Sequence, residues 1–254
     1  MALAPILFYD PCPQGIIDAT KIHGRNPDVP ESCVLCFFDD VINRLAESGE
    51  AVLVASFDTT AGLQKVYCFE RAGRRLALVH PGIGGPMAAL TLERLIALGC
   101  RNFIAVGGAG ALDPTMPPNS FIIPDSAIRD EGTSYHYLPA DARCAPGVRA
   151  LAAVENVLRE ESLRYFKGRV WTTDAFYRET PGRVAERKGQ GAIAVEMEAA
   201  SFFAVAEFRG VELGQLLYAG DLVRAEGWDA RGWMRSGCRE GLLELAARAC
   251  ASLV

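Results

Sequence analysis

One segment restricts the fold of this chain more than any other: an apolar strand, a glycine-rich turn and an amphipathic helix follow one another directly. Arg75–His80 (RLALVH) is apolar almost throughout, which predicts a strand buried on both faces. The turn Pro81–Pro86 leads into Met87–Leu98, where apolar residues recur at helical spacing, and Gly99 is expected to end that helix. A doubly buried strand that leads into a helix is typical of α/β folds.

The same alternation of apolar strands and helical segments continues along the chain. No repeat, low-complexity tract or linker interrupts it, so we expect one α/β domain over residues 1–254 with a parallel or mixed central sheet. Further strands are expected at Val52–Ser56, Lys65–Phe69, Phe103–Val106, Ser120–Pro124, Gly168–Thr173, Ala192–Val195 and Leu213–Tyr218, and further helices at Val148–Leu158, Glu198–Arg209 and Gly232–Leu253.

The charge balance limits the partners that the chain can bind. With 26 basic and 31 acidic residues the net charge is −5, and no basic patch is present for the phosphate backbone of a nucleic acid. No apolar run approaches the roughly 20 residues of a membrane-spanning helix, and the N-terminal MALAPILFYD lacks the basic start of a signal peptide. We therefore expect a cytoplasmic protein that binds neither nucleic acid nor membrane.

Eight cysteines are spread over the chain, a pattern typical of reduced, mostly buried side chains in a cytosolic protein. Cys33 and Cys36 form a CxxC motif, but a zinc site needs a second ligand pair, which the three histidines do not supply. We expect no metal site and interpret both cysteines as small hydrophobic side chains in an apolar run.

Two glycine-rich segments follow predicted strands, at the sheet edge where α/β proteins bind ligands. In Gly82–Gly85, backbone N–H groups around Ile83 and Gly84 at a helix N-terminus suit an anion. The acidic residue that a dinucleotide site requires is missing after the next strand, and a tight turn without a ligand is the alternative. Gly107 and Gly108 end that next strand and leave room for a ligand against the backbone.

Two carboxylates, Glu196 and Glu198, flank Met197 between an apolar strand and an apolar helix. In an extended segment both carboxylates point to the same side, opposite to Met197. A carboxylate accepts two hydroxyl hydrogen bonds at once, so it is a natural partner for a vicinal diol. Negative charge is also favoured at a helix N-terminus, and a capping pair without a ligand is the alternative.

Other candidate side chains follow two more strands. Phe176 and Tyr177 offer faces on which a planar ring can stack, and Arg178 beside them suits the polar edge of such a ring. Asp221 follows Ala-Gly at an expected strand end, where an acid suits proton transfer or contact with a base, and a helix N-cap is the alternative.

The segment Ile128–Pro139 is polar and aromatic, with several titratable side chains that include Arg129 and His136. It is either a solvated loop or a loop that covers a substrate or contacts another subunit.

In their order along the chain, these segments resemble the nucleoside phosphorylase superfamily, in the branch of uridine phosphorylases, hexameric purine nucleoside phosphorylases and methylthioadenosine nucleosidases. The resemblance implies a three-layer αβα sandwich around a mixed, partly barrel-like sheet. It also implies cleavage of an N-glycosidic bond with inorganic phosphate as co-substrate and no cofactor, in a homo-oligomer that is a dimer or a hexamer built from dimers. The segments that carry it are Gly82–Pro86, Gly107-Gly108, Asp125–His136, Thr173–Tyr177, Val195–Ala200 and Ala219–Asp221.

The resemblance implies roles at the sugar and at the base. Met197 would pack against the ribose, Glu198 would accept hydrogen bonds from its hydroxyls, and Glu196 would flank the same site. Phe176 would stack on the base, with Arg178 at its edge. The implied catalytic residues are Asp221 and Glu198, because a leaving base needs a proton and the oxocarbenium-like sugar needs nearby negative charge. Asp221 matches the acid of purine-handling members, so the resemblance implies a purine rather than uracil.

The phosphate-binding residues of the family are missing. The family's arginine before the glycine-rich strand end and its following hydroxyl correspond to Ala105 and Gly108 here, and Tyr9–Pro13 lacks the arginine of the N-terminal motif. Three hypotheses follow. The chain is a phosphorylase whose phosphate site uses Arg129, Arg178 or a partner subunit's residue, a nucleosidase that uses water, or a non-catalytic relative that binds nucleosides.

Overall fold

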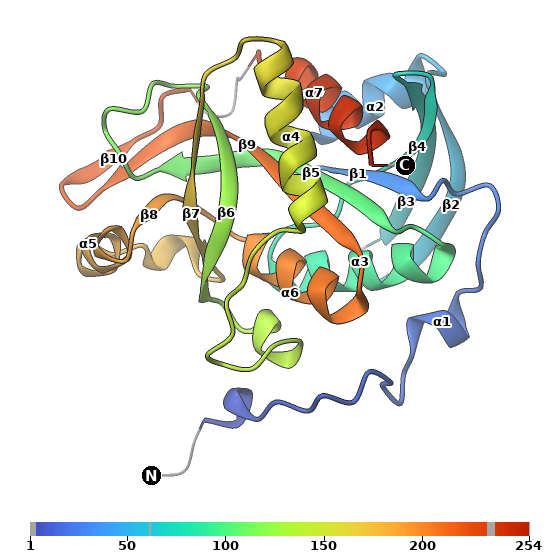
Figure 1. Ribbon diagram of the computed structural model, residues 1–254, viewed down its shortest axis with the longest axis horizontal. Helices are drawn as coiled ribbons and strands as arrows, with labels where there is room; N and C mark the ends of the chain where they lie inside the picture. The colour runs from blue at the N-terminus through green and yellow to red at the C-terminus, as the bar shows by residue number, and fades with distance from the viewer. Residues whose placement is uncertain (1–3, 61, 233–236, 254) are drawn as a thin grey trace.

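In this computed structural model, residues 4–60, 62–232 and 237–253 are described. Their strands form one sheet with helices on both faces (Figure 1). The strands are β1 Ser32–Cys36, β2 Ala51–Thr59, β3 Gly62–Arg71, β4 Arg74–Val79, β5 Asn102–Ala111, β6 Phe121–Asp130, β7 Tyr165–Thr173, β8 Ala192–Glu196, β9 Glu212–Arg224 and β10 Gly227–Asp229. The α-helices are α1 Ala19–Ile22, α2 Asp39–Glu47, α3 Gly85–Leu98, α4 Val148–Glu160, α5 Pro181–Gly189, α6 Ala199–Arg209 and α7 Arg239–Ala251, and the 3₁₀ helices are η1 Pro5–Leu7, η2 Thr133–His136 and η3 Phe176–Arg178.

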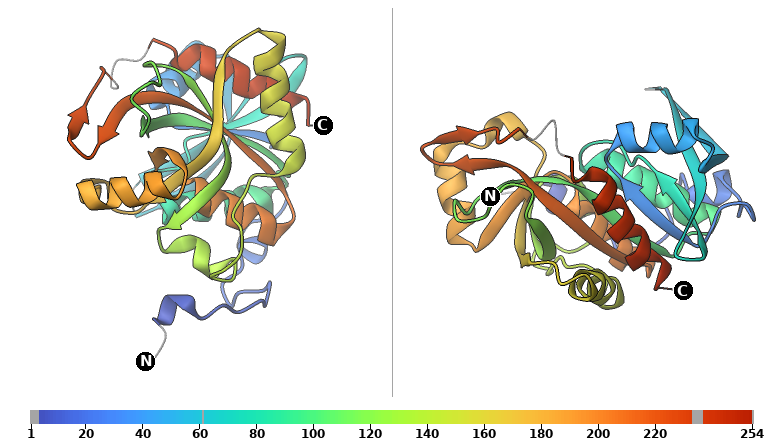
Figure 2. Two further views of the ribbon diagram at one scale, coloured as in Figure 1. Left: turned by 60° about the vertical axis from the view of Figure 1, so that its left-hand side comes forward. Right: turned by 90° about the horizontal axis from the view of Figure 1, so that it is seen from above.

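The sheet is mixed and partly closed. Its strand order is β10-β9-β6-β7-β8-β5-β1-β4-β3-β2, and β9 also pairs with β5, so that β5, β9, β6, β7 and β8 form a ring. Two junctions of the ring, β5–β8 and β6–β9, consist of two residue pairs each, which makes it an irregular ring rather than a regular barrel. The predicted α/β fold with a mixed, partly barrel-like sheet is therefore confirmed. Figure 2 shows the strands crossing at the centre of the molecule.

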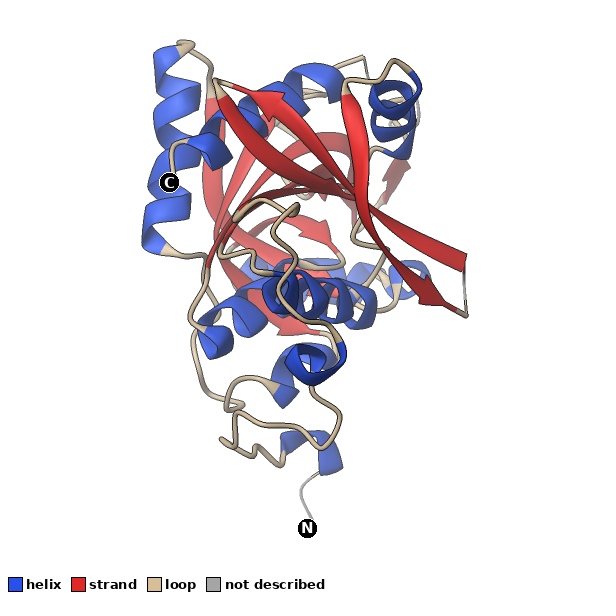
Figure 3. Cartoon of the chain, turned by 90° about the vertical axis from the view of Figure 1, so that its right-hand side faces the viewer, coloured by secondary structure: helices blue, strands red, loops and turns tan. Residues whose placement is uncertain are grey.

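Helices cover the sheet in two layers, as the three-layer arrangement requires (Figure 3). Helices α3 and α6 pack on one face, in a core cluster with Leu92 and Phe202. Helices α2, α4 and α7 pack on the other face, in a cluster with Val154 and Leu242. Strand β9 contributes Leu213 and Leu217 to the first cluster and Leu216 and Tyr218 to the second, which explains why its sequence is apolar without alternation.

Three elements continue further than the sequence predicts. Strand β5 runs through its glycines to Ala111, because it pairs in parallel with β9 along its whole length. As a consequence β9 extends to Arg224, and Asp221 lies inside the strand. The expectation of a strand end at Tyr218, and the N-cap alternative for Asp221, are wrong for this reason. Strand β6 likewise pairs with β7 as far as Asp130, so Arg129 belongs to a strand rather than to a loop.

The helix expected at Gly232–Leu253 falls partly on residues 233–236, which lie outside the described residues, and the described helix α7 begins at Arg239. Near the N-terminus, residues 4–28 run mostly as extended chain along one side of the molecule (Figure 1). None of the helices in the described ranges combines the length and the hydropathy needed to cross a membrane.

Candidate active site

A cavity of about 570 Å³ opens where the turn after β4, the glycine-rich half of β5, the end of β8 and the second half of β9 meet. Its volume lies within the roughly 300–1,000 Å³ that is common for small-molecule sites. We call it the main cavity. The predicted site residues that line it are Ile83, Gly107, Gly108, Phe176, Tyr177, Glu196, Met197, Glu198 and Asp221.

Glu198 lies in the wall of the main cavity, and its side chain accepts a hydrogen bond from the N–H of Gly84 at 2.7 Å. Gly84 is the N-cap of α3 and has a φ of 84° and a ψ of 158°, a conformation that favours glycine. The N-terminal end of α3 therefore presents a backbone donor and the positive end of its dipole to this carboxylate. The donor that the glycine turn presents is therefore used by a carboxyl group of the protein itself, rather than by a separate anion.

Glu196 has a different role from that of Glu198. One of its oxygens accepts hydrogen bonds from the N–H groups of Glu198 at 2.7 Å and Ala199 at 2.6 Å. The other oxygen accepts the hydroxyl of Thr172, whose Oγ1 accepts the N–H of Ala200 at 3.0 Å. Glu196 therefore caps the N-terminus of α6, which is the capping role that the sequence left open for the pair. Of the two carboxylates, Glu198 is the one with unused acceptor capacity toward the cavity.

Burial determines the protonation of this pair. Only 6% of Glu196 and 7% of Glu198 is exposed. Burial raises the pKa of Glu198 to about 8, and the nearby carboxylate of Glu196 adds to the rise. Burial also raises the pKa of Glu196, but its three hydrogen bonds favour the ionised form. We therefore assign the proton that the pair holds near neutral pH to Glu198.

A second acidic pair, Asp221 and Glu179, also lines the main cavity. Asp221 Oδ2 accepts a hydrogen bond from Nε1–H of Trp228 on β10 at 2.6 Å. Burial raises the pKa of Asp221, and this hydrogen bond opposes the rise. Glu179, which directly follows η3, also lines the cavity, and burial together with the charge of Asp221 raises its pKa to about 7. An acid with a pKa near 7 can release a proton at neutral pH.

The two aromatic residues of η3 lie at the mouth of the main cavity. Phe176 is 41% exposed and Tyr177 is 94% exposed, and their rings meet edge to face with centroids 5.1 Å apart. Both remain available to a planar ligand. Arg178 is exposed and is not among the described residues that line the cavity.

The packing of aromatic side chains in the wall of the main cavity explains why β5 has glycines at positions 107 and 108. A Cβ atom on Gly107 would lie 3.0 Å from the ring of Phe37, and one on Gly108 would lie 3.1 Å from the ring of Tyr218. The glycines therefore leave room for the side chains of Phe37 and Tyr218. These two aromatic rings, in turn, form part of the wall that a ligand would meet.

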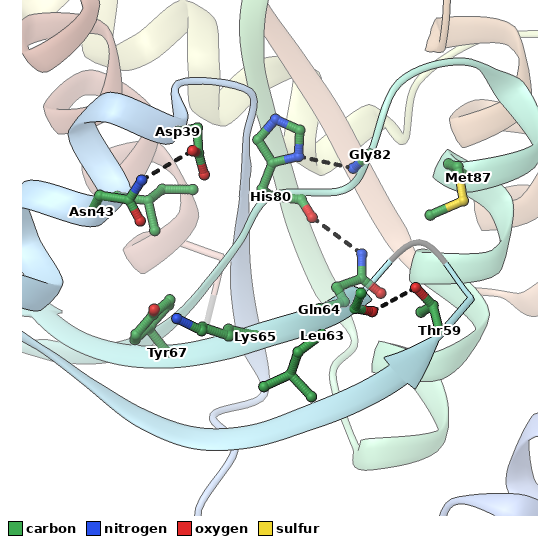
Figure 4. Close-up of a pocket in the computed structure, with 12 residues that line it drawn as sticks. Asp39, Asn43, Thr59, Leu63, Gln64, Lys65, Tyr67, His80, Gly82 and Met87 are labelled. Carbon is green, nitrogen blue, oxygen red and sulfur yellow. Dashed lines mark hydrogen bonds between the residues drawn. The ribbon is translucent and has the colours of Figure 1, made fainter.

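A smaller cavity of about 320 Å³ adjoins the main one and shares His80 with it (Figure 4). The Nδ1 atom of His80 accepts the N–H of Gly82 at 3.1 Å, and its backbone carbonyl accepts Nε2–H of Gln64 at 3.1 Å. Burial lowers the pKa of His80, so the imidazole is neutral at neutral pH.

The residues proposed for a lid or subunit contact lie elsewhere. Arg129 stacks on Tyr135, with its guanidinium carbon 4.2 Å from the ring centroid, and donates to Oγ of Ser134 at 2.8 Å and to the carbonyl of Leu138 at 2.9 Å. These contacts hold the η2 segment in place. His136 is exposed on the same segment.

Acidic side chains outnumber basic ones in the main cavity. Its described lining holds four carboxyl groups and one arginine, Arg239. That guanidinium donates to Asp40 at 3.0 Å and lies 5.5 Å from the ring centroid of Phe38. Among the described residues, no group of three or more His, Cys, Asp or Glu side chains is arranged to hold a metal ion. Cys33 and Cys36 are both fully buried and belong to core clusters on opposite faces of the sheet.

Several lining residues were not predicted from the sequence, among them Phe37, His80, Glu179, Gln215 and Arg239. Most of them carry no local signal, because they come from segments far apart in the chain. Gln215 is the exception, since it is the one polar side chain in the apolar run Leu213–Tyr218.

Comparisons with known proteins agree with this geometry. The family model described as Phosphorylase superfamily matches residues 31–240. A guanosine phosphorylase of Halorubrum lacusprofundi is 31% identical over 144 residues, which cover 57% of this chain and 60% of that protein. A uridine phosphorylase of Treponema pallidum is 30% identical over 153 residues, which cover 56% of this chain and 59% of that protein. The chain thus spans about three fifths of the length of the curated relatives that it matches.

A solved structure of AMP nucleosidase from Bacteroides thetaiotaomicron superimposes with a TM-score of 0.73 and covers 90% of each chain at 24% sequence identity. At this identity the likeness shows a shared fold. The family model, in contrast, covers most of the sequence. The chain therefore belongs to the phosphorylase superfamily.

Proposed function

We propose that this chain is an enzyme that cleaves the N-glycosidic bond of a ribonucleoside in the main cavity, with a purine base preferred. The observation that carries the proposal is the position of Glu198. It is buried, anchored to Gly84 at the start of α3, and placed beside Met197 in the same cavity as the acidic pair Asp221 and Glu179.

The sugar would bind at Glu198. When ionised, this carboxylate accepts hydrogen bonds from both hydroxyls of a ribose diol, while Met197 supplies an apolar contact for the ring. As the base departs, positive charge develops on the sugar. In its ionised form, which predominates above its pKa of about 8, a carboxylate fixed in this buried site stabilises that charge without reorganisation. The bond to Gly84 N–H fixes the carboxylate before the substrate binds.

The base would bind between η3 and Asp221. Phe176 offers a ring for stacking, and the acidic pair of Asp221 and Glu179 offers a proton. A purine presents a basic ring nitrogen to such an acid, whereas uracil presents only weakly basic oxygens, so the acidic pair supports the purine preference. The relatives in the comparison act on different bases by name, guanosine in one case and uridine in the other.

Two molecules are candidates for the acceptor of the sugar: inorganic phosphate and water. The names of the relatives favour inorganic phosphate as a co-substrate, with no other cofactor. The charges in the main cavity favour water, because four carboxyl groups and a single arginine are unfavourable surroundings for a phosphate dianion. Neither Arg129 nor Arg178 lies among the described lining residues. We therefore place hydrolysis first and phosphorolysis second.

One assay distinguishes these possibilities. The purified chain is incubated with adenosine, guanosine, inosine and uridine, with and without phosphate, and the free base and the sugar product are measured. We expect base and free ribose from a purine nucleoside without phosphate. Ribose 1-phosphate formed only with phosphate would support the second candidate, and saturable binding without base release would point to a non-catalytic relative.

The family also leads us to propose a homo-oligomer, a dimer or a hexamer built from dimers. Light scattering of the purified chain tests this directly: a monomer at micromolar concentration would contradict it.

A further inference from the structure

Glu131 is a buried acidic residue that the proposed function does not use. It directly follows β6, only 6% of it is exposed, and it is not among the described residues that line the main cavity. Its Oε2 atom accepts a hydrogen bond from the hydroxyl of Ser201 at 2.9 Å and another from the N–H of Ser134 at 2.9 Å. These bonds offset part of the cost of burying a carboxylate, and they fix it between two segments of the chain.

One of the two bonds ends on helix α6, which begins directly after Glu198. Ser201 is fully buried in the first turn of α6, three positions after Glu198, the N-cap residue. The carbonyl of Glu198 accepts the N–H of Phe202 at 2.9 Å, so the backbone of Glu198 is part of that first turn. A bond that holds Ser201 in place therefore also restricts where the backbone of Glu198 lies.

The same bond packs against the start of α3, which holds the side chain of Glu198. A Cβ atom on Gly85 would lie 2.5 Å from Oγ of Ser201 and 3.2 Å from Oε2 of Glu131. Gly85 directly follows Gly84, whose N–H donates to Glu198. The bond between Glu131 and Ser201 thus lies against the first residue of α3, at a close approach that a glycine permits.

We infer that Glu131 is a positioning residue for Glu198: it fixes the start of α6, which carries this carboxylate, against the start of α3, which donates to it. The inference rests on the proposed function, in which Glu198 binds the ribose diol. The position of the acceptor relative to the two hydroxyls determines how well it binds them, and a displacement of about 1 Å can cost about 10²-fold in rate. Glu131 acts through Glu198 and does not itself contact the sugar.

The segment Ile128–Pro139 holds Glu131 in turn. Ser134 is fully buried, its N–H donates to Glu131, and its Oγ accepts Nε–H of Arg129 at 2.8 Å. The polar side chains of this segment therefore bind one another, and through Glu131 they support the position of Glu198.

The test compares a ribonucleoside with its 2′-deoxy counterpart, because only the ribonucleoside offers the full diol to Glu198. The substrate is adenosine or guanosine, whichever reacts faster. The measured quantity is the ratio of its kcat/KM to that of the 2′-deoxynucleoside at pH 8.5, above the pKa of about 8 at which Glu198 ionises. A smaller folded fraction lowers both kcat/KM values equally, so the ratio reports the position of Glu198 and not the stability of the chain.

Three variants change the contact in steps. Ser201→Ala removes the hydroxyl donor and little volume, and we expect the ratio to fall about threefold to tenfold, because Glu131 keeps only its bond to Ser134. Glu131→Ala removes the carboxylate and should lower the ratio about tenfold or more. Glu131→Gln keeps one acceptor oxygen for both donors and should keep the ratio within about threefold of the wild-type value.

The matched control is Glu212→Ala. Oε2 of Glu212 accepts the N–H of Ala150 at 3.1 Å in the first turn of α4, and neither Glu212 nor any residue of α4 is among the described residues that line the main cavity. This variant also removes a carboxylate that binds the first turn of a helix, but the helix carries no residue of the site. It should be less stable than the wild type and keep the wild-type ratio.

The outcomes distinguish this inference from the proposed function. An unchanged ratio in both Ser201→Ala and Glu131→Ala would overturn the role of Glu131 and leave the proposed function intact. A fall of the same size in Glu212→Ala would also overturn that role, because the loss would then be a general effect of destabilisation. A wild-type chain that cleaves the ribonucleoside and the 2′-deoxynucleoside equally, or cleaves neither, would overturn the sugar site at Glu198 and with it this inference.

Discussion

The backbone N–H of Gly84 donates a hydrogen bond of 2.7 Å to Oε1 of Glu198, a residue 114 positions further along the chain. This bond joins the start of α3 to the start of α6 at the wall of the main cavity. Because α3 begins at this glycine, its dipole and its free N–H groups fix a carboxylate that would otherwise be costly to bury. The proposed sugar site depends on that arrangement.

Replacing Gly84 by alanine tests the bond. The φ of 84° and ψ of 158° are strained for any residue with a Cβ, although no heavy atom lies within 4 Å of the added carbon. The cost is therefore backbone strain alone, about 1–3 kcal/mol. We expect a lower melting temperature and about tenfold weaker nucleoside binding, because the N–H moves relative to Glu198. Calorimetry and equilibrium binding measure the two effects.

The matched control is Gly182→Ala on α5, where the added Cβ also meets no atom within 4 Å but φ is ordinary for a helix. This variant should be more stable by about 0.5–1 kcal/mol and should bind nucleoside normally. Equal effects of the two substitutions would contradict the role given to Gly84.

Removing the titration of Glu198 should change how stability depends on pH. Burial raises the pKa of this carboxyl group to about 8 in the folded chain, against about 4.3 for an unfolded glutamate. The folded state therefore holds a proton that the unfolded state has released, and stability is lost as pH rises through this window. Glu198→Gln mimics the protonated form at every pH. Its melting temperature should exceed that of the wild type by about 2–6 °C at pH 8.5 and by less at pH 5. A difference that stays constant between the two pH values would show that Glu198 is not the group that holds the proton.

Trp228 is predicted to lower the pKa of Asp221 in the main cavity. Its N–H donates to Asp221 and favours the ionised carboxylate, so Trp228→Phe should raise the pKa of Asp221 further. If protonated Asp221 supplies the proton to the base, the basic limb of the kcat/KM profile should move to higher pH by about one unit.

Trp171→Phe is the control for this shift. Trp171 makes the same kind of bond, from Nε1–H to Asp130 at 3.0 Å, outside the main cavity. Its loss should lower stability, because Trp171 is fully buried, and should leave the pH profile in place. A shift of the profile in both variants would count against Asp221 as the proton donor.

The buried amide of Gln215 leads to a stability prediction. Gln215→Met removes a buried amide whose two polar atoms have no partner among the described residues, so unfolding should cost about 1–3 kcal/mol more. A higher melting temperature would show that the unpartnered amide destabilises the folded chain. A lower melting temperature would indicate that the amide supports the fold instead.

The local parts of this structure were predictable from the sequence. The apolar runs predicted the strands, helical spacing predicted α3 and its end at Gly99, and the segment Glu196-Met197-Glu198 lines the main cavity. These features depend on neighbouring residues and on the rule that ligands bind at strand ends.

What was not predictable depends on residues far apart in the sequence. The hydroxyl of Thr172 donates a hydrogen bond to Glu196, which caps α6, and the N–H of Gly84 donates one to Glu198 in the cavity wall. Asp221 lies inside a strand because β9 extends along the glycines of β5. The periodicity of apolar residues in a sequence does not predict contacts between segments that are far apart in the chain.

The most direct test of the proposed function compares wild type with Glu198→Gln and with the exposed control Glu47→Gln in cleavage of the purine nucleoside that reacts fastest, at pH 8.5, above the pKa of about 8 at which Glu198 ionises. If Glu198 holds the ribose, its variant should lose about 10²-fold in kcat/KM, the scale of one charge-stabilising group in a transition state, and Glu47→Gln should lose nothing. Equal kcat/KM for the wild type and Glu198→Gln would contradict the central claim, that this buried carboxylate binds the sugar whose bond is cleaved.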